Sequence, residues 1–274
     1  MKLKNKILIT GHEGYIGNFL INFLKQKKIK YKKINLDKIN NYNFKNYSHF
    51  IHLQFYIQNK KSNIKKNINN INKVIKICEN NNLFLIFPST ASFKFKNKKR
   101  VKNNLNVINN YTFAKDYCEK KILLSNKINN LKFTIFRIFN VYGSSVNNRY
   151  YISTIIKEFI NISDKIKIKY YKNIRDYIHI KDLSDLIYKS ISKKSTGIFE
   201  VASGKSISIK NLATKIRNNY FPKKDLIFIN PAKSKVNDYS KSNIKSTLKV
   251  FNWRPKISIE NGLKKLILST SLND

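Results

Sequence analysis

The stretch Thr10-Gly11-His12-Glu13-Gly14-Tyr15-Ile16-Gly17, residues 10–17, decides the fold of this chain. It holds three of only seven glycines, each three residues from the next. A short apolar run at 6–10 precedes it and predicts a buried strand, while helix-spaced apolar residues follow over 15–27. A glycine loop between a strand and a helix lets a phosphate approach bare backbone at the helix N-terminus. The alternative is a purely structural turn.

The first half of the chain alternates between strand and helix patterns. We expect strands at residues 6–10, 31–36, 49–53, 83–87 and 133–139, and helices at 15–27, 64–78 and 110–124. This alternation predicts an α/β fold, a Rossmann-type doubly wound parallel sheet with helices on both faces. The segment 39–48 is unusual because it is too short for a full crossover helix.

The second half is less regular, and we expect it to form a smaller C-terminal lobe, the substrate-binding lobe. Its patterns indicate helices at 153–162, 183–192, 207–216 and 259–268, another after Ser240, and short strands at 177–180 and 198–201. We therefore predict a dinucleotide-binding domain from residues 1–142 and 176–196. Residues 143–175 and 197–274 would form the substrate lobe.

Composition favours an ordered protein with a lysine-rich surface. Apolar residues make up 42% of the chain and aromatic residues 13%, enough for a sizeable core. The formal charge is +40, but 49 of the 55 basic residues are Lys, and 40 residues are Asn. A nucleic-acid reader would use Arg for bidentate contacts, so we expect a solvated Lys/Asn surface and no nucleic-acid partner. The alternative, a polyanion-binding face, predicts binding that falls steeply with salt.

Other whole classes of protein are excluded on similar grounds. Cys78 and Cys118 are two unclustered cysteines, which argue against a disulfide scaffold or a metal site and suit a reducing cytoplasm. No apolar run approaches the ~20 residues of a membrane span, so we expect no membrane partner. The basic start leads into too short an apolar run for a signal peptide.

Four polar residues are candidates for chemistry. Asp37 lies 20 residues beyond Gly17. An acid at this position can accept hydrogen bonds from both hydroxyls of an adenosine ribose, which favours NAD over NADP; the alternative is a surface turn residue.

Tyr111 and Lys115 share one helix face, and an ammonium one turn away lowers the pKa of a phenol. Tyr-x-x-x-Lys alone is weak among 16 Tyr and 49 Lys. Its place after the fourth strand, with Thr90 beyond that strand's end, strengthens it.

With these motifs in this order, the chain resembles the extended short-chain dehydrogenase/reductase family, in particular the NAD-dependent epimerase/dehydratase group that acts on nucleotide sugars. The resemblance runs from about residue 5 to 268. It rests on the glycine stretch and on Ile51-His52-Leu53, Pro88-Ser89-Thr90-Ala91-Ser92, Asn110-Tyr111-Thr112-Phe113-Ala114-Lys115, Arg137-Ile138-Phe139-Asn140-Val141-Tyr142-Gly143, Arg175-Asp176-Tyr177-Ile178-His179 and Asn252-Trp253-Arg254-Pro255.

The resemblance implies roles for particular residues. Thr90, Tyr111 and Lys115 would be catalytic, with Tyr111 as general acid/base during hydride transfer at sugar C4. Substrate would meet Thr90, Asn140 and Arg175, the last binding the diphosphate. The cofactor, NAD with NADP as an alternative, would be bound by Gly11, Gly14, Tyr15, Ile16, Gly17, Asp37, Leu53, Tyr111 and Lys115. A homodimer formed through the helix of Tyr111 and its neighbour is also implied.

Departures from the family pattern keep the exact function open. Ala91-Ser92 replaces the Asp-Glu of the dehydratases, so we do not expect 4,6-dehydration. Gln54-Phe55 replaces two small residues and adds bulk beside the cofactor, and Phe93-Lys94-Phe95 replaces Val-Tyr-Gly. We expect an NAD(P)-dependent nucleotide-sugar epimerase or 4-keto reductase. The alternative is a catalytically decayed nucleotide-binding or complex-forming module on the same fold.

Overall fold

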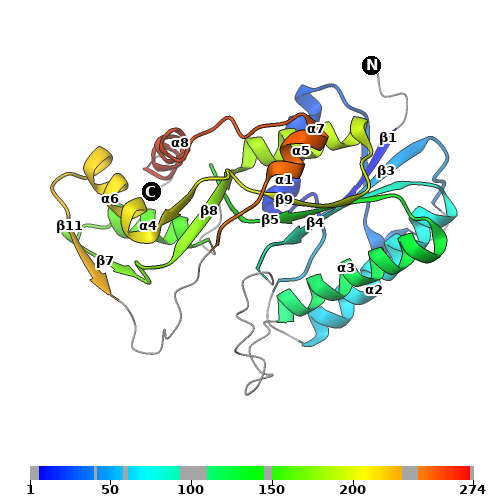
Figure 1. The fold of residues 1–274 in the computed structure, drawn as a ribbon, viewed down its shortest axis with the longest axis horizontal. Helices are drawn as coiled ribbons and strands as arrows, with labels where there is room; N and C mark the ends of the chain where they lie inside the picture. Colours follow the sequence, from blue (N-terminus) through cyan, green and yellow to red (C-terminus); the bar gives the residue numbers. More distant parts are fainter. Residues whose placement is uncertain are drawn as a thin grey trace. The chain divides into compact units, whose positions relative to one another are not determined.

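A computed structural model describes residues 6–39, 42–57, 61–92, 110–144, 150–229 and 240–271 (Figure 1). The chain divides into two compact units. Unit 1 comprises Met1–Ile138, Ser184–Glu200 and Lys245–Trp253, and unit 2 comprises Phe139–Leu183, Val201–Ile244 and Arg254–Asp274. Each unit encloses an apolar core of its own.

Unit 1 is built on a six-stranded sheet. Its order is β2 (Tyr31–Lys33), β1 (Lys6–Thr10), β3 (Tyr47–His52), β4 (Phe84–Thr90), β5 (Phe133–Ile138) and β9 (Gly197–Val201). The pairs β1–β2, β1–β3, β3–β4 and β4–β5 are parallel. β2 lies on one side of β1, and the next strand along the chain, β3, lies on the other side of β1. The direction in which strands are added to the sheet therefore reverses at β1. Ligands of open α/β sheets bind outside the carboxyl ends of the strands at such a reversal.

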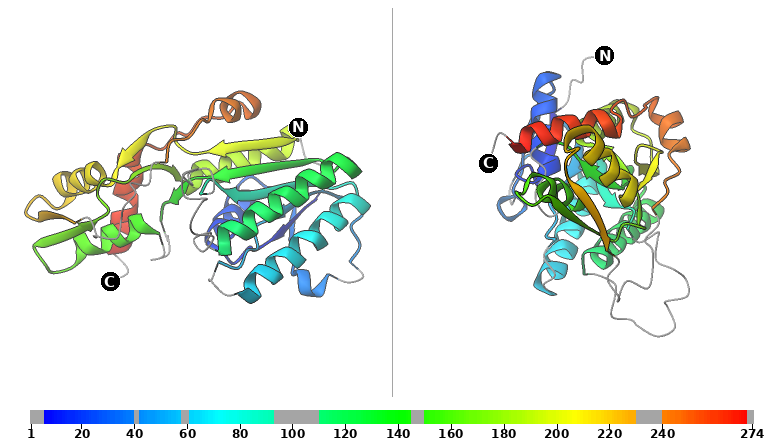
Figure 2. Two further views of the ribbon diagram at one scale, coloured as in Figure 1. Left: turned by 60° about the horizontal axis from the view of Figure 1, so that its bottom comes forward. Right: turned by 90° about the vertical axis from the view of Figure 1, so that its left-hand side faces the viewer.

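Helices cover both faces of this sheet (Figures 1 and 2). One face carries α2 (Lys61–Asn80) and α3 (Asn110–Asn129), and the other carries α1 (Tyr15–Gln26) and α5 (Ile180–Lys193). The layer beneath α2 and α3 is a continuous apolar core. Its members include Leu8, Phe50, Ile71, Val74, Cys78, Leu85, Phe87, Cys118, Ile122, Phe133 and Ile135. The predicted α/β fold is therefore confirmed.

The second strand is shorter than predicted. It ends at Lys33, and a 3-10 turn, η1 (Leu36–Lys38), follows. The turn forms because the side chain of Asn35 accepts a hydrogen bond from the amide of Asp37 at 2.9 Å, while the Lys73 ammonium donates to the carbonyl of Leu36 at 2.8 Å. The described parts of the 39–48 connection contain no helix, as its length predicts.

Unit 2 contains two small sheets. One has the order β10 (Ser206–Ser208), β8 (Ile174–His179) and β6 (Asn140–Tyr142), and the other pairs β11 (Asp225–Ile229) with β7 (Lys165–Lys169). Three helices pack on them: α4 (Tyr151–Ile160), α6 (Ile209–Tyr220) and α8 (Ile259–Ser271). The sequence predicted these helices but missed β6, β7, β10 and β11.

The boundaries between the units differ from the predicted ones. Residues 139–142 and 176–183 fall in unit 2, because β6 pairs with β8. Residues 197–200 fall in unit 1, because β9 neighbours β5. The helix α7 (Lys245–Phe251) also belongs to unit 1: Phe251 packs on Phe199 with ring centroids 4.8 Å apart.

We predict that Gly11→Ala destabilises unit 1 while Gly14→Ala does not. Gly11 has φ +67°, and a Cβ there would lie 2.6 Å from the Cα of Gln54. The cost should be about 3 kcal/mol, from left-handed backbone strain and overpacking. A Cβ on Gly14 would meet its nearest atom at an ordinary 3.4 Å, so its effect should stay within about 0.5 kcal/mol. Urea denaturation of both variants checks this, and equal losses of stability would contradict it.

Candidate active site

The glycine loop is a tight turn leading into α1. The amide of Gly14 donates to the carbonyl of Gly11 at 3.2 Å, and the amide of Asn18 donates to the carbonyl of Gly14 at 2.8 Å. A Cβ on Gly17 would lie 2.7 Å from the Cα of His12, so close helix–loop packing requires this glycine. Gly14 is exposed and is the N-cap of α1, and Tyr15 and Ile16 open the helix. Protein packing therefore requires glycine at positions 11 and 17, whereas a Cβ on Gly14 would make only an ordinary contact of 3.4 Å with the carbonyl oxygen of Gly11.

The end of β3 lies beside this loop. The amide of Leu53 donates to the carbonyl of Thr10 at 3.3 Å, which holds Leu53 next to the glycine turn. The hydroxyl of Thr10 and Nδ1 of His52 share a hydrogen bond of 2.8 Å. Burial lowers the pKa of His52 to about 3, with a smaller effect from the charge of Lys115, so His52 is neutral at pH 7. It serves as a buried link between β1 and β3.

Lys115 is the most enclosed cation of the candidate site. The residue is 5% exposed, and its ammonium donates to the carbonyl of Pro88 at 2.6 Å. The same ammonium lies 3.9 Å from the ring centroid of Phe55 and 4.5 Å from that of Phe87. Burial lowers the pKa of Lys115 to about 8 from its ordinary 10.5, although the charge of Glu119 opposes the change. The hydrogen bond to Pro88 and the two ring contacts hold the side chain near the end of β4.

Tyr111 and Thr90 belong to the same corner of unit 1. Tyr111 opens α3 one turn before Lys115, and its ring meets that of Phe55 edge to face with centroids 5.5 Å apart. Thr90 is the last residue of β4, two residues after Pro88. Its hydroxyl shares a hydrogen bond of 2.9 Å with the hydroxyl of Ser92. The structure thus gathers all three predicted catalytic residues where α3 meets the carboxyl end of β4.

Sequence reasoning missed a buried ionic network behind this corner. Glu119 is 2% exposed and receives two hydrogen bonds on Oε2 from Arg137, of 2.7 Å and 3.1 Å. The hydroxyl of Ser89 donates to Oε1 of the same carboxylate at 2.5 Å. The network ties α3, β4 and β5 together. The sequence feature that could have indicated this network is the spacing of Lys115 and Glu119, which lie one helical turn apart and so share a face of α3.

Asp37 lies in η1 rather than at the end of a strand. Its side chain is exposed, and its backbone amide is held by Asn35. Lys33 and Lys38 are exposed nearby in the sequence. Asp37 lies four residues after the end of β2, and its carboxylate is in contact with solvent.

The predicted substrate residues Asn140 and Arg175 belong to unit 2, whereas the three catalytic candidates belong to unit 1. The side-chain amide of Asn140 donates to the carbonyl of Asp176 at 2.9 Å, which fixes the register of β6 on β8. Asp176 is fully buried and accepts from the hydroxyls of Ser203 and Ser242, at 2.7 Å and 2.6 Å. Arg175 precedes it on β8 and is partly buried.

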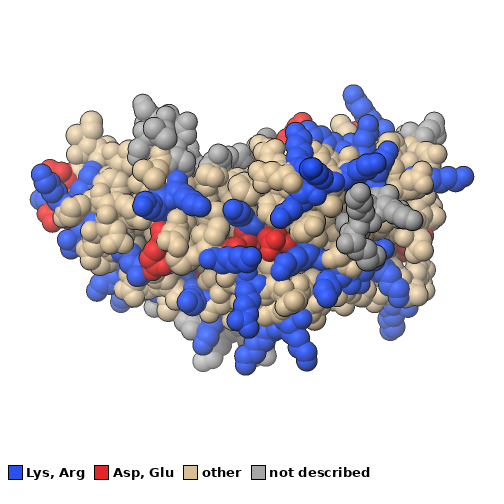
Figure 3. All heavy atoms as spheres, turned by 90° about the horizontal axis from the view of Figure 1, so that it is seen from above, with Lys and Arg blue, Asp and Glu red and all other residues tan. Residues whose placement is uncertain are grey.

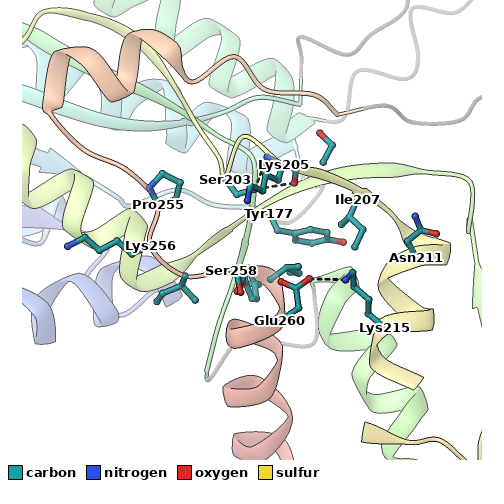
Figure 4. A pocket seen from close by; sticks show the side chains of 14 residues that line it. Tyr177, Ser203, Lys205, Ile207, Asn211, Lys215, Pro255, Lys256, Ser258 and Glu260 are labelled. Atoms are coloured by element: carbon teal, nitrogen blue, oxygen red, sulfur yellow. Dashed lines mark hydrogen bonds and ion pairs between the residues drawn. The ribbon is translucent and has the colours of Figure 1, made fainter. Parts of the chain in front are cut away.

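Unit 2 also contains a pocket of about 460 Å³ (Figure 4). It is bordered by Tyr142 and Tyr177, by the first two turns of α6 and the first turn of α8, and by the segments 203–207 and 255–258. Lys215 and Glu260 face each other there and form an ion pair of 2.9 Å. None of the predicted site residues lines this pocket.

The distribution of charge agrees with a solvated surface. On the face drawn in Figure 3, Lys and Arg side chains are scattered among uncharged residues rather than gathered in one patch. Among the described residues, no group of His, Cys, Asp and Glu is arranged to hold a metal ion. Within the same residues, no helix combines the length and apolar character needed to cross a membrane.

Comparison with known proteins identifies the family. The sequence model of the NAD dependent epimerase/dehydratase family matches residues 49–202, more than half of the chain. The chain belongs to this family. It is 25% identical to dTDP-4-dehydro-6-deoxyglucose reductase of Escherichia coli over 97% of this chain and 98% of the relative. It is also 25% identical to GDP-6-deoxy-D-talose 4-dehydrogenase of Aggregatibacter actinomycetemcomitans, over 69% of this chain and 70% of the relative.

Solved structures support the fold over the whole chain. A UDP-N-acetylglucosamine 4-epimerase from Methanobrevibacter ruminantium has a TM-score of 0.81 and 21% identity, with complete coverage of both chains. RMD from Pseudomonas aeruginosa, solved with NADPH, has a TM-score of 0.82 and 13% identity, covering 98% of this chain and all of that one. The predicted cofactor NAD is the one that the family description names, which confirms it. The chain therefore belongs to a family of NAD-dependent enzymes that modify nucleotide sugars.

We predict that Glu119→Leu destabilises unit 1 by about 3 kcal/mol, because it removes the buried charge that Arg137 and Ser89 bind. Asp116→Ala is the matched control on the same helix. Its ion pair with Lys120 is exposed, with 43% and 73% of the side-chain surfaces accessible, so the loss should be about 0.5 kcal/mol or less. Denaturant unfolding of both variants measures the difference. A Glu119 variant as stable as the Asp116 control would contradict the network's role.

Proposed function

We propose that this protein transfers hydride at C4 of a nucleotide sugar with NAD(P), as an epimerase or a 4-keto reductase, with Tyr111 as general acid/base. The observation that carries the proposal is the hydrogen bond between the Lys115 ammonium and the Pro88 carbonyl. It fixes the helix of Tyr111 against the strand end that carries Thr90. A phenol, an ammonium and a hydroxyl in one corner are the groups that proton transfer to or from a sugar oxygen requires.

The glycine loop fits the diphosphate of the dinucleotide. A Cβ on Gly14 would meet no protein atom closer than 3.4 Å, so contacts within the protein do not require glycine at this position. A bound diphosphate that approaches the bare backbone would require it. The residue caps α1, whose first amides and dipole favour an anion. Gly11, Gly17, Tyr15 and Ile16 would shape the loop and Leu53 would border the cofactor. The exposed carboxylate of Asp37 would accept the ribose hydroxyls, which favours NAD over NADP.

The dinucleotide, when bound, accepts or supplies the hydride. Tyr111 would exchange a proton with the sugar oxygen, although an ordinary phenol has a pKa near ~10 and is a weak base at pH 7. The ammonium of Lys115, one helical turn away, would stabilise the phenolate that forms when Tyr111 gives up its proton. Because burial lowers the pKa of Lys115 only to about 8, its side chain remains largely charged at pH 7. Thr90 would hydrogen-bond the same sugar oxygen.

The choice of C4 is supported by the relatives. The two curated proteins reported above are a 4-dehydro sugar-nucleotide reductase and a sugar-nucleotide 4-dehydrogenase, and both names describe redox chemistry at C4. Arg175 would bind the substrate diphosphate and Asn140 the sugar nucleotide. Ala91-Ser92 offers no acid and base after Thr90, so we propose that the reaction is not a 4,6-dehydration.

A second candidate is a decayed nucleotide-binding module on the same fold. The observation that favours it is the bulk of Phe55, whose ring covers the ammonium of Lys115. The presence of Thr90, Tyr111 and Lys115 together favours the enzyme. Residues 93–95, which also depart from the family pattern, lie outside the described residues.

We predict that Tyr111→Phe lowers kcat by about 10²–10⁴-fold while leaving dinucleotide affinity nearly unchanged, because it removes only the phenolic hydroxyl that exchanges the proton. Turnover of nucleoside-diphosphate 4-keto sugars or hexoses and a titration with NADH provide the two readouts. Tyr117→Phe, which lies on the same helix and outside the proposed site, serves as the control. Retained turnover in Tyr111→Phe would remove the phenol from the mechanism.

We also propose a homodimer formed through α2 and α3. On α3, Phe113, Leu124 and Ile128 are 46%, 48% and 68% exposed. At 100° per residue these side chains occupy the helix face opposite Lys115 and Ile122. An apolar stripe exposed on the outer face of a helix is typical of a contact surface between copies.

The double variant Leu124→Glu/Ile128→Glu should be monomeric, because burying carboxylates in such an interface is costly. Light scattering coupled to gel filtration measures the mass of the wild type and the variant. Ile162→Glu, at a residue that is 97% exposed in unit 2, is the control and should retain the wild-type mass. A monomeric wild type, or a dimeric double variant, would overturn the proposal.

A further inference from the structure

Phe55 occupies an unusual place in the candidate site. It lies three residues after the end of β3 and contacts both Lys115 and Tyr111. The Lys115 ammonium lies over the face of its ring, and the rings of Phe55 and Tyr111 pack in a T-shaped arrangement. The centroid of Phe55 is only 3.9 Å from Nζ, against 4.5 Å for Phe87. This distance is well inside the ~6 Å limit of a cation–π contact.

The three groups around the ammonium differ in their freedom to move. Phe87 and Pro88 are buried residues of β4, in the middle of the sheet of unit 1. Phe55 is partly exposed and belongs to the segment 53–57, which is neither helix nor strand. An ammonium has three N–H donors, and Pro88 accepts from one of them. A ligand hydroxyl can reach the ammonium most readily from the side that Phe55 covers.

We propose that Phe55 determines the affinity of this site for a dinucleotide, because its ring covers Lys115 in the free protein and must leave when a ribose hydroxyl binds there. This inference rests on the proposed function, in which Lys115 holds the cofactor. Phe55 acts through Lys115 and is a positioning residue rather than a catalytic one.

Competition between the ring and the ribose predicts opposite effects of two substitutions. The free protein must break the contact between Phe55 and Lys115 before the dinucleotide binds. The apparent affinity is therefore the intrinsic affinity multiplied by the fraction of molecules in which the ring has left Lys115. Phe55→Ala removes the ring, so NADH should bind about tenfold more tightly. Phe55→Trp offers the ring that attracts cations most strongly, so NADH should bind more weakly than to the wild type. A merely structural Phe55 would give weaker binding in both variants.

The experiment is a fluorescence titration of the full-length protein with NADH at pH 7. It compares the wild type, Phe55→Ala, Phe55→Trp and Lys115→Met. Ile57→Ala is the matched control, since Ile57 lies in the same segment and is 53% exposed. Its NADH affinity should equal that of the wild type. Thermal unfolding of every variant verifies that it is folded.

The outcomes separate this inference from the proposed function. Tighter binding in Phe55→Ala together with weaker binding in Phe55→Trp supports the inference. If Lys115→Met weakens NADH binding while Phe55→Ala leaves it unchanged or weaker, the inference is overturned and the proposed function stands. If the folded wild type binds no dinucleotide, or binds it independently of Lys115, both are overturned.

Discussion

The constraint on which the site depends is the burial of one positive charge. Lys115 is 5% exposed, and an ammonium so enclosed is stable only when the groups around it compensate for the lost water. The carbonyl of Pro88 accepts one hydrogen bond, and the rings of Phe55 and Phe87 present their negative faces. Because Pro88 belongs to β4 and Lys115 to α3, the contacts that stabilise the charge also align the helix with the strand end.

A buried carboxylate completes this arrangement one helical turn further on. Glu119 binds Arg137 of β5 and Ser89 of β4, so α3 is attached to two neighbouring strands by polar contacts as well as by the apolar core. The charge of Glu119 also opposes the lowering of the Lys115 pKa by burial. The network therefore supports the geometry of the corner and keeps its cation charged near neutral pH.

Much of unit 1 could be predicted from the sequence because its signals are long or chemically strict. The glycine stretch 10–17 and the buried strand before it left few alternatives, and the long helices showed a clear period. The strands of unit 2 were harder: β6 and β10 have only three residues each, and the alternation of β7 was hidden in a chain rich in Lys and Ile. The bulk of Phe55 was evident from the sequence, but its contact with Lys115 depends on how segment 53–57 turns back after β3.

The most direct test of the account is the amount of dinucleotide that the protein holds. The protein is purified natively, equilibrated with NADH, separated from free ligand and denatured in acid, and the released NAD(H) is quantified by mass spectrometry. The account predicts close to one dinucleotide per chain for the wild type and a clear loss for Lys115→Met. Dinucleotide already present before equilibration would favour an epimerase that recycles its cofactor. A folded protein that releases none under either condition would contradict the central claim.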